Sequence, residues 1–164
     1  GSEMCIRDRY IRLGYRNKFK ELMEQAFDND PNNAVLYYNL GVINGEQGMT
    51  DDAIAYYKKA LELDPKYSAT YLNLVGIILQ GEAELVEQMN ELATSTKRSD
   101  FEKYDRLKEE REALYISCLP YLEKLIEIDP NNIEALKTAK NIYYTVGNNE
   151  KFNIMSSKID EIEN

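Results

Sequence analysis

The sequence contains no histidine and no tryptophan, and its two cysteines are Cys5 and Cys118. Without histidine the chain lacks the commonest general base and the commonest metal ligand. Two cysteines are too few for a zinc cage or a disulfide framework. No apolar run approaches the ~20 residues that cross a bilayer, and nothing near the start resembles the apolar part of a signal peptide. We therefore expect a soluble, non-catalytic protein without cofactor or metal, and both the cytoplasm and the bacterial periplasm remain open as its compartment.

Basic residues are also scarce relative to acidic ones. The 164 residues include 20 Lys and Arg but 29 Asp and Glu, which gives a formal net charge of −9. Because such a chain repels phosphate backbones, we expect no nucleic acid among its partners. The length suits one domain or a short array of repeats.

Three Asp-Pro pairs divide the chain, at Asp30-Pro31, Asp64-Pro65 and Asp129-Pro130. Each follows an amphipathic run. Pro31 and Pro65 are 34 residues apart, and Pro65 and Pro130 are 65 apart, which is 31 more than 34. This recurrence predicts a 34-residue repeat with one insertion.

The clearest unit runs from Ala34 to Tyr67 and is predicted to form two helices that meet at Gly48. The first helix has apolar residues three to four apart, Thr50 is placed to cap the second, and Pro65 ends it. We expect the small residues Gly41 and Ala53 to let the two backbones approach closely, with Tyr57 beside them.

This unit resembles the tetratricopeptide repeat family. The residues that carry the resemblance are Tyr37, Leu40, Gly41, Ala53, Tyr57, Ala60 and Pro65, whereas Asn44 stands where the family prefers Tyr. The resemblance implies an all-α fold, a right-handed α-solenoid of about four helix pairs and so eight helices. The general pattern is similar to that of bacterial repeat-array proteins.

The resemblance divides the whole chain into one array of four units, at about 1–33, 34–67, 68–132 and 133–164. The first unit keeps Tyr10, Gly14, Met23 and Ala26 in phase. Before Tyr10 the phase fails, Gly1-Ser2 looks like a cloning scar, and residues 3–9 resemble a translated sequencing adapter. We therefore expect residues 1–9 to be non-native and the chain to be a fragment of a longer array.

The insertion falls in the third unit, at about residues 82–112, and lengthens both helices into an antiparallel hairpin. We expect a polar tip at 94–99, with Ser99 as the N-cap of the second helix and Glu102 reaching back to it. The predicted seam leaves no second apolar face for a partner, so we expect a spacer or a polar contact arm. Further along the second helix, Pro120 predicts a kink or break near Ser117.

The geometry of such a hairpin places Glu82 opposite Arg111 or Glu112. Two readings of this position remain open. Glu82 and Arg111 form a salt bridge that fixes the register, or both side chains extend to solvent.

Catalytic chemistry has little support in the sequence. Cys118 occupies a small-residue position of the repeat and is expected to be a buried structural thiol. Adjacent carboxylates such as Asp51-Asp52 point apart on a helix, so they do not form an acid–base pair.

In the family, ligands lie along a concave groove made by the first helix of each unit. The resemblance therefore assigns partner-binding roles to ten residues: Val35, Tyr38, Val42, Glu46, Leu72, Gly76, Leu79, Lys137, Asn141 and Tyr144. The function it implies is a non-catalytic protein-interaction module that binds a peptide or partner segment in this groove. The alternatives are a structural, self-associating segment of a longer scaffold and an accessory domain of an enzyme.

Overall fold

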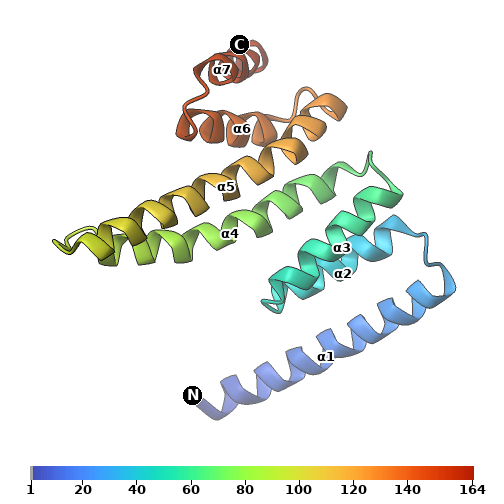
Figure 1. The fold of residues 1–164 in the computed structure, drawn as a ribbon. Coiled ribbons are helices and arrows are strands. Elements are labelled where there is room, and N and C mark those ends of the chain that lie inside the picture. Colours follow the sequence, from blue (N-terminus) through green and yellow to red (C-terminus); the bar gives the residue numbers. More distant parts are fainter. Residues whose placement is uncertain (1) are drawn as a thin grey trace. The chain divides into compact units, whose positions relative to one another are not determined.

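A computed structural model of the chain describes residues 2–164, with side chains described from Arg12 onward. The expectation that residues 1–9 are non-native therefore concerns side chains outside those described. Residues 2–164 form seven helices and no strand, so the all-α prediction is confirmed (Figure 1). The chain divides into two compact units, Gly1–Thr70 and Tyr71–Asn164.

The first unit contains α1 (Ser2–Asn29), α2 (Ala34–Glu46) and α3 (Thr50–Leu63). Its core is the interface of α2 with α3, where Leu40, Ala53 and Ala60 are at most 1% exposed. A Cβ atom on Gly41 would lie only 2.6 Å from the ring of Tyr57. The predicted close approach of the two helices is therefore confirmed, and it depends on the missing side chain at Gly41.

The turns inside two of the helix pairs are built alike. Gly48 and Gly147 both have a φ of 76°, which favours glycine. The next residue donates its N–H to a carbonyl five residues back, from Met49 to Asn44 and from Asn148 to Tyr143, each at 2.8 Å. This is the Schellman end of a helix, and its recurrence is direct structural evidence of the repeat.

The Asp-Pro loops also recur. In each, the residue three positions after the aspartate donates its N–H to the aspartate carbonyl, at 3.2, 3.2 and 3.1 Å for Asp30, Asp64 and Asp129. Asn33 and Asn132 then accept backbone N–H groups of α2 and α6 (Ile133–Thr145) with their side chains. These N-caps fix where the first helix of a pair begins.

The first repeat unit, at about residues 1–33, does not form the pair of helices that the sequence predicts. Gly14 lies inside α1, which continues from Ser2 to Asn29 without a turn. After Gly147, the side chain of Asn148 caps α7, whereas Tyr15-Arg16 follows Gly14. The predicted cap at Thr50 was wrong, because α3 begins at Thr50 after Met49 and has no side-chain cap. Neither Tyr nor Arg offers an N-cap for a second helix, and one glycine inside a helix costs only about 1 kcal/mol. The described residues therefore contain three helix pairs and one single helix.

Asn44, where the sequence departs from the family pattern, is fully buried. Its side chain donates to the Leu40 carbonyl at 2.7 Å and accepts from Lys20 Nζ of α1 at 3.3 Å. The Asn44 amide therefore has a hydrogen-bond partner for both its nitrogen and its oxygen, and it joins α1 to α2. A Tyr side chain would not reproduce this role.

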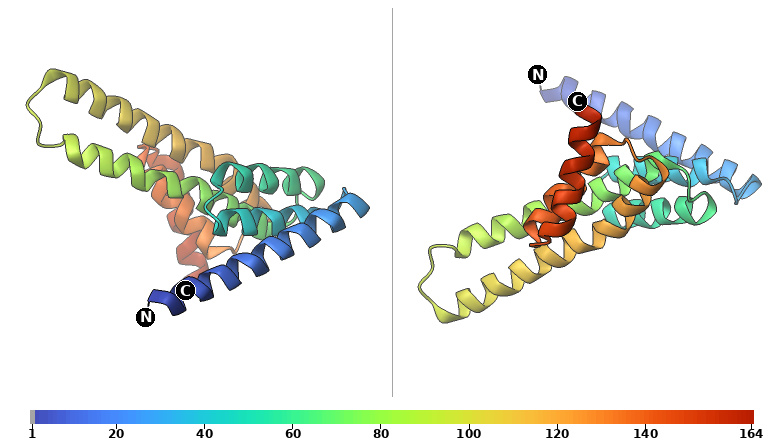
Figure 2. Two further views of the ribbon diagram at one scale, coloured as in Figure 1. Left: turned by 90° about the horizontal axis from the view of Figure 1, so that it is seen from below. Right: turned by 90° about the horizontal axis from the view of Figure 1, so that it is seen from above.

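The second unit contains most of α4 (Ser68–Leu92), then α5 (Arg98–Ile128), α6 and α7 (Asn149–Glu163). Helices α4 and α5 run antiparallel to each other and are joined by a loop at one end, as both views of Figure 2 show. This confirms the predicted long hairpin. At the other end of α5, Glu123 accepts hydrogen bonds from Tyr143 of α6 and Lys151 of α7, both at 2.5 Å, so one carboxylate joins three helices.

Two local predictions for α5 were wrong. The helix begins at Arg98 with Lys97 as its N-cap, and Ser99 lies within its first turn. The hairpin loop is instead held by Ser95, whose hydroxyl donates to Asp100 at 2.5 Å and accepts from the Lys97 N–H at 3.2 Å. Pro120 does not break the helix, which runs through to Ile128, so the predicted break was wrong, while a kink at this position stays a prediction.

Candidate functional site

The ten groove residues predicted from the sequence lie on α2, α4 and α6, and none of them is buried. Val35, Tyr38, Val42 and Glu46 are on α2, in the first unit. Leu72, Gly76 and Leu79 are on α4, and Lys137, Asn141 and Tyr144 are on α6, all in the second unit. Each group is therefore considered in its own unit.

On α2, two of the four predicted residues are already engaged inside the protein. Tyr38 packs its ring against Tyr67 at 4.9 Å and Tyr57 at 5.9 Å between centroids. Glu46 lies 3.8 Å from Arg16 of α1. Val35 is 49% exposed. Of the α2 positions, Val35 thus offers the most apolar surface, while Tyr38 also supports the aromatic core.

On α6, Lys137 forms an exposed ion pair with Glu163 of α7 at 2.7 Å. Such a pair is worth at most about 1 kcal/mol, so a partner could displace it at little cost. Tyr144 is 69% exposed, and one side of its ring faces Phe152 at 5.7 Å. The α6 positions therefore give a polar surface with one accessible aromatic ring.

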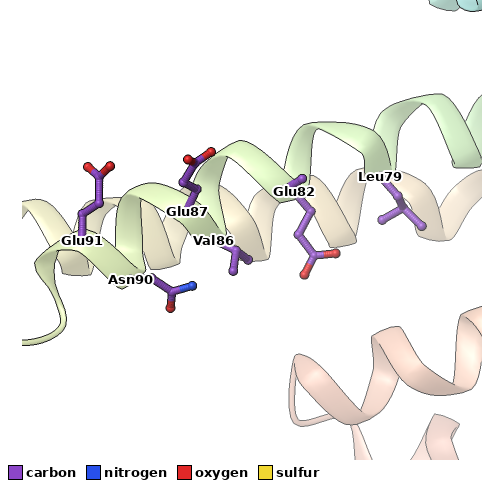
Figure 3. A pocket seen from close by; sticks show the side chains of 7 residues that line it. Leu79, Glu82, Val86, Glu87, Asn90 and Glu91 are labelled. Carbon is purple, nitrogen blue, oxygen red and sulfur yellow. The ribbon is translucent and has the colours of Figure 1, made fainter.

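On α4, the structure contains a hollow of about 790 Å³ along the helix, and seven residues line it. They are Leu79, Glu82, Ala83, Val86, Glu87, Asn90 and Glu91. Leu79 is the one groove residue predicted from the sequence among them. Figure 3 shows Glu87 and Glu91 on the opposite side of the helix from Val86 and Asn90. The hollow thus has an apolar floor and an acidic edge.

The floor of the hollow extends a regular surface that begins in the repeat itself. Leu72, Gly76, Leu79, Ala83 and Val86 are spaced by four, three, four and three residues, and none is buried. We call these five residues the α4 stripe. Spacing of this kind is that of a helix face that packs against another helix.

The α4 stripe corrects the expectation that the hairpin leaves no second apolar face. The inner seam of the hairpin buries Met89 and Leu107, whereas Phe101 is 54% exposed. Ala83 and Val86 were missed because they lie on the other side of the same helix. The alternating spacing was a signal of this face that the sequence already contained.

One edge of the stripe is fixed by a partly buried polar cluster. Arg111 of α5 donates to Glu82 Oε1 through Nε at 2.9 Å and Nη2 at 2.5 Å. The hydroxyl of Tyr115 donates to the same oxygen. Of the two open readings for Glu82 and Arg111, the structure therefore shows the salt bridge.

This cluster also changes the acidity of Glu82. Burial raises the pKa of the Glu82 carboxyl, but the hydrogen bonds from Tyr115 and Arg111 outweigh burial, and the pKa lies below its ordinary value. Glu82 stays ionised and neutralised by Arg111, so its charge is not free to meet a partner.

The other edge of the stripe is acidic and unneutralised. Glu87 and Glu91 are exposed, and neither forms an ion pair within the described part of the chain. Because they are four residues apart on one helix, their like charges repel each other. A cation placed beside them would relieve that repulsion.

The described side chains supply little for catalysis. They contain no group of three or more His, Cys, Asp or Glu residues that could hold a metal ion. Cys118 is fully buried, as predicted, and burial raises the pKa of its thiol to about 11. A thiol in that state is a poor nucleophile near neutral pH.

The comparison with protein families agrees with this architecture. The sequence pattern of the tetratricopeptide repeat family matches residues 34–67, the segment that contains α2 and α3. Residues 34–67 are a tetratricopeptide repeat. Repeats of this family mediate protein–protein interactions, and they serve as scaffolds more often than as enzymes.

Solved structures extend the similarity to nearly the whole chain. The structure described as "MamA MSR-1 C2" has a TM-score of 0.56 at 16% identity, over 94% of this chain and 71% of its own. A tetratricopeptide repeat protein of Thermus thermophilus, TTC0263, has a TM-score of 0.50 at 15% identity, over 94% and 70%. A monomeric mutant of IFIT1 with Gppp-AAAA has a TM-score of 0.55 at 17% identity, over 87% and 29%. At these identities the likeness concerns the fold alone.

Among curated proteins, the chain is similar to the photosystem I assembly protein Ycf3 of Rippkaea orientalis. The two are 28% identical over 110 residues, which is 66% of this chain and 54% of that protein. The chain thus spans about half the length of this relative. A search of the described helices finds none that combines the length and apolar character of a membrane span.

Proposed function

We propose that the chain is a non-catalytic interaction module, which binds a peptide or partner segment along the open face of α4, the first helix of the pair that begins the second unit. The observation that carries this proposal is the α4 stripe, an unburied apolar face that continues for five positions. Leu72, Leu79 and Val86 are partly exposed, and contiguous apolar surface that is left open to solvent is typical of a binding site. The name of the relative Ycf3, an assembly protein, supports a role in bringing other proteins together.

The absence of nucleic acid among the ligands is part of the same proposal. IFIT1 shares the fold and is described with the capped oligonucleotide Gppp-AAAA, so the fold alone decides nothing. The net charge of −9 supports a protein partner, because it would repel a phosphate backbone.

Selection from a peptide library displayed on phage tests the groove without knowledge of the natural partner. Leu72→Glu places a charge at the first position of the α4 stripe and should reduce binding of the selected peptides at least tenfold. Glu109→Gln, on an exposed position of α5, is the control and should leave binding unchanged. If peptides selected on the native protein bind the Leu72→Glu variant equally well, this face is not the site.

A second candidate function, self-association within a longer scaffold, is favoured by a different observation. Tyr15, Phe19 and Leu22 are 74%, 47% and 50% exposed, and their spacing places them on one face of α1. If this face joins copies of the chain, sedimentation velocity will show a dimer that Phe19→Glu converts to a monomer. A native protein that stays monomeric at about 100 μM would remove this candidate.

A further inference from the structure

We propose that the partner segment is a basic amphipathic helix, which lies lengthwise on the α4 stripe with its cationic edge beside Glu87 and Glu91. This inference rests on the proposed function and makes it more specific. It specifies the conformation of the bound segment, its charge, and the end of the groove that binds its charged side chains.

The spacing of the stripe selects a helix over an extended peptide. Apolar positions that alternate by four and three residues keep one face turned toward a neighbouring helix along its length. An extended peptide repeats every two residues and would not stay in register with them.

The sizes of the stripe residues point the same way. Leu72, Leu79 and Val86 alternate with Gly76 and Ala83. A Cβ atom added to Gly76 would meet no atom within 4 Å, so the space above it is open. Large side chains of a partner helix would fit over Gly76 and Ala83 and lie between the three larger residues, as knobs fit into holes.

The charge of the partner follows from the two edges of the stripe. At one edge Glu82 is neutralised by Arg111 and Tyr115 within the protein. At the other edge Glu87 and Glu91 have no cationic partner in the described part of the chain. Lys or Arg residues on a docked helix would meet uncompensated carboxylates only at this second edge, so the helix is basic on one flank.

The length of the stripe sets the length of the partner. From Leu72 to Val86 the helix rises about 21 Å. A partner helix of about three heptads would cover this distance and reach past Glu91. The part of the stripe beyond Glu82 exists only because the hairpin extends α4.

Three synthetic peptides of about three heptads provide the test. The first has Leu at both apolar positions of each heptad and Lys on the flanks; the second has Glu in place of Lys; the third has the composition of the first in scrambled order. Fluorescence anisotropy should show that the native protein binds the first peptide, at least tenfold more weakly the second, and the third not at all. If the basic and scrambled peptides bind equally well, the charge of the peptide alone determines binding, and the proposal fails.

Variants of the protein then locate the docked helix. Val86→Glu should weaken binding of the basic peptide at least tenfold, and the double variant Glu87→Lys with Glu91→Lys should reverse the preference between the basic and acidic peptides. The matched control carries Glu109→Lys with Glu110→Lys on α5, which makes the same change of charge away from the stripe and should preserve the preference. Circular dichroism of each variant checks that the helices remain.

The outcomes separate this inference from the proposed function. If binding of the library peptides requires Leu72 but neither Val86 nor Glu87, the groove binds partners and the proposed docking of a helix is wrong. If neither Leu72→Glu nor Val86→Glu affects any ligand, both are wrong. If Val86→Glu instead dissociates a dimer of the native chain, a second copy occupies the stripe and the basic helix is excluded.

Discussion

At the scale of single residues, the packing of the repeat depends on which side chains are absent. Gly41 lets the ring of Tyr57 approach the backbone of α2 so closely that a methyl group there would overlap it. Tyr57 is only 3% exposed, and burial raises the pKa of its hydroxyl to about 12. The ring is therefore enclosed on its other sides and has little freedom to move away.

Substitution of Gly41 by Ala tests this packing. Ala gains about 1 kcal/mol in helix propensity over Gly, but the overlap with Tyr57 should cost about 1–3 kcal/mol, so we expect no gain and up to about 2 kcal/mol of net destabilisation in urea unfolding. Gly14→Ala is the matched control, since a Cβ atom there meets nothing within 4 Å, and it should stabilise the chain by about 1 kcal/mol. Equal stabilisation by both substitutions would show that Tyr57 yields without cost.

Several residue-level features were predictable from the sequence because each depends on a local rule. Gly41, Ala53 and Cys118 occupy positions where a small or apolar side chain must face another helix, and all three are buried. The hydrogen bonding of the loop before α5 was not predictable in the same way. Ser95 and Ser99 both precede carboxylates at suitable spacings, and only the path of the loop decides which hydroxyl is used.

At the scale of elements, α4 and α5 are held together by an apolar seam and one charged cluster. The cluster joins Glu82 of α4 to Arg111 and Tyr115 of α5, and Arg111 also lies 5.4 Å from the centre of the Tyr115 ring. The side chains of Glu82 and Arg111 are 27% and 34% exposed, so water screens the pair only in part. The cluster fixes how the two helices are aligned along their length.

The contribution of Glu82 to stability should depend on pH. Its pKa in the folded chain lies below the ordinary carboxyl value, so its stabilising effect is fully present above the ordinary pKa of about 4.3 and is lost as the pH falls through the folded value. At pH 7 Glu82→Gln should cost about 1 kcal/mol. In urea unfolding at a series of pH values, this difference should shrink toward zero below about pH 4.

Glu109→Gln provides the control for that series, because it removes the same charge from an exposed position of α5. It should cost little at any pH. The native protein and Glu82→Gln could instead differ in free energy of unfolding by the same amount down to pH 3. That result would mean that the hydrogen-bonding geometry of Glu82 contributes to stability and its charge does not.

The sequence predicted the helix pairs more reliably than the exceptions to them. Helix α1 continues past Gly14, where no N-cap residue follows. The absence of an N-cap residue is a weaker signal in a sequence than its presence. Pro120 was expected to interrupt α5, but its neighbour Ile116 is 49% exposed. The Ile116 carbonyl, which loses its usual N–H partner to Pro120, can therefore bind water instead.

At the scale of the whole molecule, the extension of α4 and α5 is an addition to a repeat that is otherwise regular. Beyond Glu82, α4 continues for about 15 Å before the loop, and α5 runs for about 20 Å from the loop to Arg111. The fully buried residues of α5 lie on the other side of this boundary, at Cys118, Leu122 and Leu125, where α5 meets α6. The groove positions Leu72 and Gly76 also lie outside the extension, whereas Val86, Glu87 and Glu91 lie within it.

Deletion of residues 82–112 therefore separates the fold from the docking of a helix. It restores the 34-residue spacing and joins Gly81 to Ala113 near the position of the turn in the other pairs. Because the deletion keeps the fully buried residues of α5, which are Cys118, Leu122 and Leu125, and the buried residues of α6 and α7, we expect the shortened chain to unfold cooperatively and to keep nearly the same mean residue ellipticity. Library peptides that depend on Leu72 should still bind, but the basic helical peptide should bind at least tenfold more weakly. A shortened chain that is unfolded by circular dichroism would show that the hairpin stabilises the rest of the second unit, and that it is more than an added docking surface.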